Sequence, residues 1–488
     1  MTKKLKKKNH SDEVDTQPVK RFFVEMFTRD IDLADALLDL LDNCVDGLIR
    51  STVPTQAQAE NKPYVGYWAK LKITKDSFEI EDNCGGIPWS EKDRAFRMGR
   101  PTSNVPTSFD SKLLVGVYGI GMKRAIFKIG QIAEIHTKTL DDEYLVSIPR
   151  GWMENETTWK LVTSDPDTTL AHNGTRIKVT SLRDEISSAF ISEDFQTKLL
   201  EKISTHYSII ISKGLKVTLQ FDKESTDIKP KSLGLHFQKE PNANGEVIRP
   251  YVFQSTPEQG LEVTVAVGLR EPIPGVETIL NEQEGTRFTT DYAGWTVICN
   301  DRVVLHCNRD EMTGWGTAGV PRYHTQFIAI SGFVEFKGDP SKLPTNTTKR
   351  GLEFSSRLYQ QVLDRMREGT LMFTAYTNWW KSREVEAKSH VAPTPSLELP
   401  ELKKMVLSSN INMAAVKTGL VGRQYKPSLP KPSNDQVDSR ISFHRPKKLI
   451  DRLANKILDG IEEYESKDIP RALGEALFDA AIAQHRIK

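Results

Sequence analysis

The clearest pattern in the chain is a helical spacing of apolar residues between positions 31 and 50. Leucine and valine recur there at intervals of three to four residues, and Thr28 or Asp30 stands where a helix cap is expected. Short segments rich in isoleucine and valine follow, and they predict strands at 71–81, 131–139, 142–148 and 175–180. The first 190 residues therefore predict a domain in which helices and strands are mixed.

Similar patterns continue in the second half of the chain. They predict helices at 193–207 and 355–380, and strands at 216–221, 261–268, 295–299 and 327–336. The proline-dotted segments 392–400 and 426–433 are typical of a linker, and helical spacing returns at 446–487. We therefore expect a basic flexible tail at 1–22, mixed domains at 23–190 and 191–385, a linker at 386–445 and a helical region at 446–488.

Composition changes this picture little. The chain has 488 residues with 67 basic and 65 acidic side chains, so binding to nucleic acid would have to be local. The four cysteines show no CxxC spacing, which disfavours zinc and favours buried thiols in a reducing compartment. Neither a signal peptide nor an apolar run of about 18 residues is visible, so we expect a cytoplasmic protein that does not enter a membrane.

Three polar side chains lie on one stripe of the first predicted helix. Asp39, Asn43 and Asp46 have the spacing i, i+4 and i+7, which places them on the same face. Carboxylate and amide oxygens suit Mg²⁺, and a carboxylate can orient or deprotonate an attacking water. The alternative is a solvated acidic face.

Two glycine-containing segments add to this stripe. Asp82 ends an apolar strand and is followed by Gly85 and Gly86; it could accept a hydrogen bond from an exocyclic amine while the glycines admit a flat ring. The loop from Gly116 to Lys123 precedes an apolar-periodic helix, so its backbone N–H groups and the lysine could hold a polyphosphate. The alternatives are a plain turn and a flexible connection. The loop has neither the P-loop spacing nor a preceding strand for a dinucleotide fingerprint.

These pieces, followed by Thr175 after Gly174, stand in the order found in the GHKL ATPases, which the first 180 residues resemble. The resemblance implies an α+β chain: a Bergerat two-layer α/β sandwich that binds ATP with Mg²⁺, then an α/β transducer-like domain and a helical C-terminal tail. Residues 101–114 would form the lid. Asp39 takes the place of the usual catalytic glutamate, one methylene shorter, which predicts slow hydrolysis.

The resemblance also assigns roles to individual residues. Asn43 resembles the Mg²⁺ ligand, and Asp82 resembles the adenine acceptor. Further nucleotide contacts are implied at Asp46, Gly86, Ile87, Gly116, Tyr118, Gly119, Ile120, Gly121, Met122, Lys123 and Thr175.

Within the family, the segment 118–123 is most similar to the MORC, topoisomerase VI and MutL-type ATPases. The segment 343–350 resembles their transducer loop, so Lys349 would reach the γ-phosphate, with Lys342 as the second choice and a plain surface loop as the alternative. A cation there would make the geometry between domains depend on the nucleotide.

We therefore expect an ATP-gated clamp that forms a homodimer and acts on DNA in genome maintenance or antiviral defence, beside an effector protein encoded nearby. Local support for DNA comes from the lysines at 1–8, the basic tract 440–448 and the tryptophans Trp379 and Trp380. The alternatives are a chaperone-like or scaffolding ATPase with protein clients, and a nucleotide-bound regulator that does not hydrolyse ATP. The apolar stripe of the C-terminal region predicts a core or a dimer contact.

Overall fold

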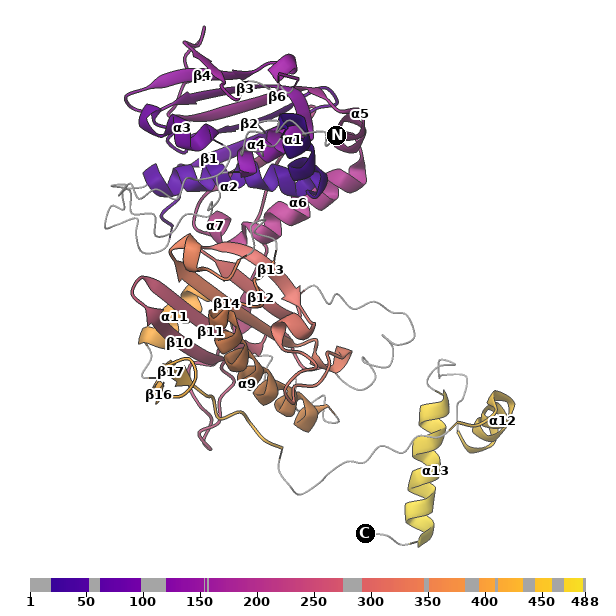
Figure 1. Ribbon diagram of the computed structural model, residues 1–488. Coiled ribbons are helices and arrows are strands. Elements are labelled where there is room, and N and C mark those ends of the chain that lie inside the picture. Colours follow the sequence, from indigo (N-terminus) through magenta and orange to yellow (C-terminus); the bar gives the residue numbers. More distant parts are fainter. Residues whose placement is uncertain are drawn as a thin grey trace, which may run out of the picture. The chain divides into compact units, whose positions relative to one another are not determined.

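A computed structural model describes residues 19–51, 62–97, 120–152, 154–155, 158–274, 292–345, 351–381, 395–408, 411–432, 444–458 and 469–485. The chain divides into two compact units, Met1–Pro432 and Ser433–Lys488. The larger unit contains two large sheets and a third sheet of two strands, with helices packed against them, which fits an α+β fold (Figure 1).

The first sheet has eight strands in the order β5-β4-β3-β6-β2-β1-β7-β8. Neighbouring strands are antiparallel except β1 and β7, which are parallel. Buried and more exposed residues alternate along β1, β2 and β4, so one face of the sheet is buried there. The bounds are β1 Trp68–Ile73, β2 Phe78–Asp82, β3 Gly130–Lys138, β4 Glu143–Ile148, β5 Val162–Ser164, β6 Gly174–Leu182, β7 Lys216–Phe221 and β8 Glu224–Asp227.

A layer of helices covers the buried face of this sheet. Helix α2 runs along the sheet, and α4 and α6 pack beside it (Figure 1). Leucines spaced along α2 enter one continuous core with the strands, which explains why the strongest helical pattern of the sequence lies here. The helices are α1 Lys20–Arg29, α2 Leu33–Ser51, α3 Lys92–Phe96, α4 Gly121–Ile129, α5 Asp184–Phe190, α6 Glu193–His206 and α7 Ser208–Ser212.

The helix expected at 31–50 and the strands expected at 131–139, 142–148 and 175–180 are confirmed within one or two residues. The single strand expected at 71–81 is wrong, because β1 and β2 form a hairpin there. The turn is closed by Thr74, whose N–H donates to the Ser77 carbonyl at 2.9 Å and whose hydroxyl accepts from the Ser77 N–H at 3.0 Å.

The second sheet has seven strands in the order β13-β12-β14-β11-β10-β17-β16, and the long helix α9 packs across it (Figure 1). The predicted helix 355–380 and the strands at 261–268 and 295–299 are confirmed. The run 327–336 becomes a strand only at Ile330, because a 3-10 turn precedes it. The bounds are β10 Tyr251–Glu258, β11 Leu261–Leu269, β12 Gly294–Cys299, β13 Arg302–Asn308, β14 Ile330–Gly338, β16 Ala414–Val416, β17 Gly422–Tyr425 and α9 Arg357–Trp380.

Two expectations about domain boundaries differ from the structure. Strand β7 was expected in the second domain but pairs with β1 in the first sheet, so residue 191 does not separate the two sheets. The expected linker 386–445 carries β15 Ser396–Glu398, which pairs with β9 Gly234–His236, and also α11 Leu399–Ser408, β16 and β17. The proline pattern was misleading because Pro400 lies in the first turn of α11, where proline is tolerated.

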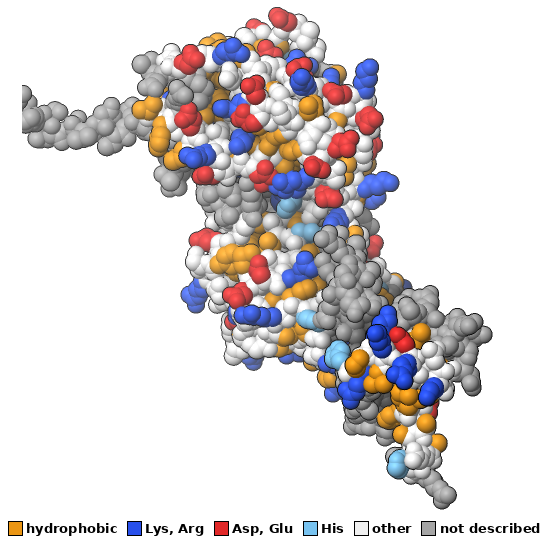
Figure 2. Space-filling view, turned by 90° about the vertical axis from the view of Figure 1, so that its right-hand side faces the viewer, with side chains coloured by type: hydrophobic (Ala, Val, Ile, Leu, Met, Phe, Trp, Pro, Cys, Tyr) orange, Lys and Arg blue, Asp and Glu red, His pale blue; other side chains and the backbone are white. Residues whose placement is uncertain are grey.

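Residues 444–458 and 469–485 of the smaller unit contain two helices, α12 Lys447–Ile457 and α13 Ile469–His485, which pack against each other. Within the described part of this unit, only Ala454 and Leu473 are buried. Leu449, Leu453 and Phe478 remain exposed, and Figure 2 shows hydrophobic side chains beside basic ones on these helices. Among the described residues, no helix combines the length and apolar character needed to cross a bilayer.

Candidate functional site

Asp82 lies at the end of β2 and is almost completely buried. Its Oδ1 accepts a hydrogen bond from the Cys84 N–H at 2.8 Å. Burial raises the pKa of Asp82, while hydrogen bonds from the Cys84 N–H, the Cys44 thiol and the Thr175 N–H act in the opposite direction. The carboxylate is therefore held in a fixed orientation at the edge of the sheet.

The glycines that follow Asp82 allow close approaches of the backbone. Gly86 has φ +72°, and a Cβ there would lie 2.1 Å from the Lys138 carbonyl oxygen. A Cβ on Gly174 would lie 1.8 Å from the Asp82 carbonyl oxygen. These positions require glycine, whereas Cys84 has an ordinary negative φ and fits without strain.

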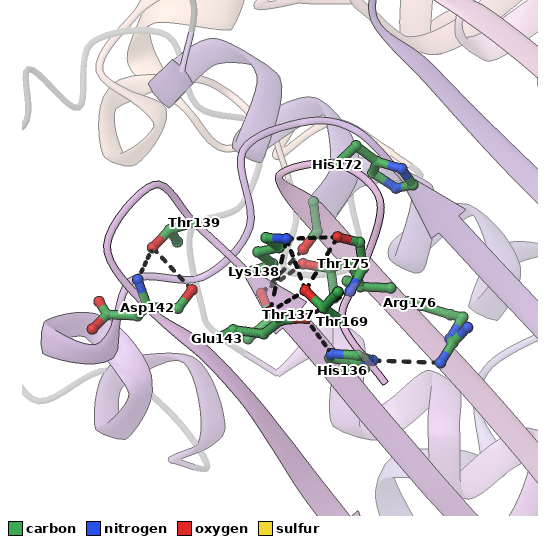
Figure 3. A network of polar contacts seen from close by, with 12 residues as sticks. His136, Thr137, Lys138, Thr139, Asp142, Glu143, Thr169, His172, Thr175 and Arg176 are labelled. Atoms are coloured by element: carbon green, nitrogen blue, oxygen red, sulfur yellow. Dashed lines mark hydrogen bonds and ion pairs between the residues drawn. The ribbon is translucent and has the colours of Figure 1, made fainter. Parts of the chain in front are cut away.

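A hydroxyl pair fixes the loop after Gly86 (Figure 3). The Oγ1 atom of Thr137 on β3 accepts from the Ile87 N–H at 2.7 Å and lies 3.1 Å from the Oγ1 of Thr175 on β6. The Tyr144 hydroxyl donates to the Ile87 carbonyl at 3.1 Å. The ends of β2, β3 and β6 are thereby joined near Asp82, and Gly86, Ile87 and Thr175 lie close together.

A second polar network lies farther along the same strands (Figure 3). His136 Nε2 is 2.9 Å from Glu143 Oε1, and the Arg176 guanidinium lies 3.4 Å from His136 Nδ1. Glu143 also accepts from the Thr169 hydroxyl and the Leu170 N–H. These contacts tie the segment before β6 to β3 and β4. They therefore support the N-terminal end of β6, where Thr175 lies.

The stripe on α2 is not a solvated acidic face. Asp39 and Asp46 are buried, whereas Asn43, one turn from each, is exposed. Its amide oxygen therefore remains open to a ligand while the two carboxylates are held within the protein.

Asp39 touches the beginning of α4. The Arg124 guanidinium donates from Nη2 to Asp39 Oδ2 in a largely buried ion pair. A Cβ on Gly121 would lie 3.3 Å from the Asp39 Cβ and 3.5 Å from Oδ2. The first turn of α4 therefore packs directly on the carboxylate that the sequence assigned to catalysis.

Lys123 is buried, and its ammonium donates at 2.7 Å to the carbonyls of Ala95 and Arg97 at the end of α3. Met122 enters the core, and Ile120 stands at the N-cap of α4 without a side-chain capping bond. Gly116, Tyr118, Gly119, the predicted lid and Lys349 lie outside the described residues.

The comparison with protein families decides the identity of this arrangement. Residues 31–182 match a family described as histidine kinase-, DNA gyrase B- and HSP90-like ATPases. This segment is a GHKL-type ATPase domain. No curated protein matches the chain. The ATPase domain accounts for ATP binding and, at the level of the family, for ATP hydrolysis.

The ATPases of this family use Mg²⁺ with ATP. The donor set on α2 fits this ion, because Asn43 presents an exposed amide oxygen and Mg²⁺ keeps most of its waters. We therefore regard Asn43 as the residue suited to hold Mg²⁺, while Asp39 and Asp46 lie one turn away.

A buried ion pair joins the ATPase domain to the second sheet. Arg302 on β13 donates from Nε to Asp42 Oδ1 at 2.9 Å, and the Tyr207 hydroxyl donates to the same oxygen at 2.6 Å. The guanidinium also lies 4.3 Å from the centre of the Tyr207 ring. Asp42 stands between Asp39 and Asn43 in sequence, so the second sheet contacts α2, the helix that carries both of these candidate site residues.

Two predicted features of the second domain have other contacts in the structure. Lys342 pairs with Glu258 at 3.1 Å. Trp380 is buried and donates to the Pro430 carbonyl at 3.0 Å, so it does not form an exposed stacking surface with Trp379. On the face in Figure 2, acidic and basic side chains are interspersed over the larger unit.

Sequence reasoning missed Arg124, Asp42, Thr137 and Cys44. Arg124 directly follows Lys123, and this adjacency was the signal that could have drawn attention to it. The other three are ordinary in the sequence, because their importance comes from partners distant in the chain.

Proposed function

We propose that the chain is an ATP-driven conformational switch in which Asp82 binds adenine and Asp39 is the general base for hydrolysis. The observation that carries this proposal is the position of Asp39, buried on α2 against the first turn of α4. In the sequence, the glycine loop that begins at Gly116 runs directly into this helix turn. A carboxylate there can act on the water that attacks the terminal phosphate.

Asp82 supports the adenine end of the proposal. An ionised carboxylate only accepts hydrogen bonds, and the adenine exocyclic amine donates them. The Cys84 N–H already orients the buried Asp82 carboxylate, so binding the amine requires little rearrangement. Gly86 keeps side-chain atoms away from the flat ring.

The proposed reaction is hydrolysis of ATP to ADP and phosphate. A water oxygen forms a bond to the γ-phosphorus while the bond from that phosphorus to the β–γ bridging oxygen breaks. The water proton passes to the Asp39 carboxylate, and ADP leaves with the bridging oxygen. When bound at Asn43, Mg²⁺ would neutralise phosphate charge. Lys123 stands at the mouth of α4 and is our candidate for a phosphate contact, with Lys349 from the second domain as the other.

The switch follows from the buried pair between Asp42 and Arg302. A nucleotide that moves α2 also moves the residue to which the second sheet is attached. We further propose that ATP closes the chain into a homodimer acting on DNA, in genome maintenance or antiviral defence, with an effector encoded nearby. This part rests on the resemblance to MORC, topoisomerase VI and MutL-type ATPases, with a transducer role for the second sheet. A chaperone-like action on protein clients is the alternative.

One observation favours a second candidate, a nucleotide-bound regulator with little or no turnover. Asp39 is one methylene shorter than the glutamate usual in the family, and it is paired with Arg124. Both features slow proton abstraction. We therefore expect a slow ATPase, and a regulator is the limiting case.

The test is ATP binding and phosphate release by the full chain with Mg²⁺. Asp39→Asn should keep ATP affinity but lose roughly 10²–10⁴-fold in kcat. Asp82→Asn should weaken ATP binding at least about tenfold, because its amide presents donors to the adenine amine. Asp76→Asn, in the exposed β1–β2 turn, is the matched control. Binding without phosphate release by the wild type would support the regulator, and unchanged ATP affinity in Asp82→Asn would overturn the site.

The clamp is tested separately. A non-hydrolysable ATP analogue should increase the hydrodynamic size of the chain, and affinity for duplex DNA should fall with salt. An unchanged size would contradict the dimer. Stimulation of turnover by protein and not by DNA would favour the chaperone-like alternative.

A further inference from the structure

The guanidinium of Arg124 has more hydrogen-bond donors than its surroundings use. Its Nη2 donates to Asp39, while its Nε–H is buried and has no hydrogen-bond partner among the described residues. The side chain is 11% exposed, so solvent does little to satisfy it. A buried donor without a partner costs free energy, and an anionic ligand beside it would supply the missing acceptor.

The ion pair also restrains Asp39 as a base. A proton arriving on Oδ2 would lie against the positive guanidinium and would end a charge-assisted hydrogen bond. In the pair observed here, the guanidinium occupies Oδ2, so Asp39 is poorly placed to receive a proton from water. Efficient hydrolysis requires that Arg124 find another anion.

The two cations that begin α4 differ in this respect. The Lys123 ammonium donates to the carbonyls of Ala95 and Arg97, whereas Arg124 faces Asp39. Gly121 brings the helix close enough for this, because any side chain there would touch the carboxylate. Of these two cations, Arg124 is thus the one that contacts the proposed base.

From these contacts we propose that Arg124 is a triphosphate sensor, which pairs with Asp39 until the terminal phosphate of ATP takes the guanidinium and frees the carboxylate. The inference rests on the proposed function, in which one water lies between Asp39 and the γ-phosphorus. Two hydrogen-bond lengths of about 3 Å then separate Asp39 from that phosphate, which lies within reach of an arginine already touching Asp39. ADP lacks the terminal phosphate and leaves the pair intact.

The proposal predicts a specific loss of discrimination between ATP and ADP. Arg124→Gln should lower the ratio of ADP Kd to ATP Kd about tenfold, with ADP affinity nearly unchanged, because only ATP offers the second anion. Its kcat should fall about 100-fold through loss of a donor to the transition-state charge. Arg124→Lys keeps a cation and should recover part of the ratio and of kcat.

The matched control is Lys128→Gln on the same helix, whose ammonium donates to the Thr28 carbonyl at 3.1 Å. It should leave both affinities and kcat unchanged. If Arg124 only stabilised the fold, Arg124→Gln would weaken the binding of ATP and ADP equally. A ratio of ADP Kd to ATP Kd within about threefold of the wild-type ratio would overturn the proposal. ADP binding reports whether each variant folds, and Arg124→Lys decides by the same ratio if Arg124→Gln does not fold.

Failure of the proposed function gives a different result. In that case the wild type would not bind ATP, or Asp82→Asn would bind ATP as tightly as the wild type. A wild type that binds and hydrolyses ATP, together with an unchanged ratio in Arg124→Gln, contradicts only the role of Arg124.

Discussion

Asp39 and Asp42 stand one turn apart on α2, and both are buried in ion pairs with arginine, yet their surroundings differ. Asp42 is 1% exposed and receives a hydrogen bond from Tyr207 and, across the boundary to the second sheet, one from Arg302. Arg302 also donates to the Val303 carbonyl. Asp39 pairs with an arginine of its own domain, and that arginine keeps a buried N–H that has no hydrogen-bond partner in the part of the chain that the structure describes.

The difference separates a permanent contact from an exchangeable one. A buried ion pair whose hydrogen bonds are satisfied loses most of them if it opens, so the Asp42 pair holds the second sheet to α2. A pair with a spare donor can change partner when an anion arrives, because the anion replaces one bond and adds another. We therefore infer that nucleotide acts on the Asp39 side of α2 and that the Asp42 side carries the movement onward.

Removing Asp42 should have the largest effect on stability. Asp42→Ala leaves Arg302 buried without its partner and should lower the free energy of unfolding by about 3–5 kcal/mol. Asp32→Ala, which breaks solvent-exposed pairs with Lys198 and Lys202, should cost less than about 1 kcal/mol. Urea denaturation followed by tryptophan fluorescence measures both. Equal losses in the two variants would mean that the Asp42 pair is not the stronger connection.

The second largest effect on stability is expected from acid, which should weaken the contact on the Asp42 side of α2. His206, beside Tyr207, donates from Nδ1 to the Val303 carbonyl at 2.6 Å, and burial lowers the pKa of His206 to about 3. The unfolded chain takes up that proton near pH 6.5, so stability is lost as pH falls from there toward 3. Between pH 7 and pH 5 the loss should be about 2 kcal/mol.

The check is to measure unfolding at both pH values in His206→Asn. This variant should lose most of that part of the pH dependence, whereas His324→Asn, at an exposed position, should keep it. The assignment fails if His206→Asn has the same pH dependence as the wild type.

The smallest stability effect is expected on the Asp39 side. Without nucleotide, Arg124→Gln should lower the free energy of unfolding by about 1.5 kcal/mol, through loss of one charge-assisted hydrogen bond. That is well below the effect of Asp42→Ala in the same urea titration. A loss as large as that of Asp42→Ala would mean that both pairs are structural, and it would remove the distinction between them.

Sequence patterns predicted the elements that carry the site better than the contacts within it. The leucine spacing of α2 and the alternation along β3 and β6 are local and were sufficient for those elements. The stripe on α2 led to Asp39 but not to Asp42, because Arg302 lies 260 residues away in the chain. The partner of Asp39, 85 residues away, was equally invisible.

Local patterns also failed where two elements share one apolar run or where proline occurs at a tolerated place. The segment 71–81 contains a turn that its alternation concealed, and Pro400 lies in the first turn of a helix. The parallel pairing of β7 with β1 depends on the folded topology, and nothing in the sequence of β7 indicates which sheet it joins.

The central claim is that nucleotide opens the Asp39 pair and leaves the Asp42 pair closed. The most direct measurement is a structure of the full chain with Mg²⁺ and a non-hydrolysable ATP analogue. We predict the Arg124 guanidinium at the terminal phosphate and away from Asp39, with Arg302 still bonded to Asp42. A terminal phosphate bound without Arg124, with the Asp39 pair intact, would contradict the account.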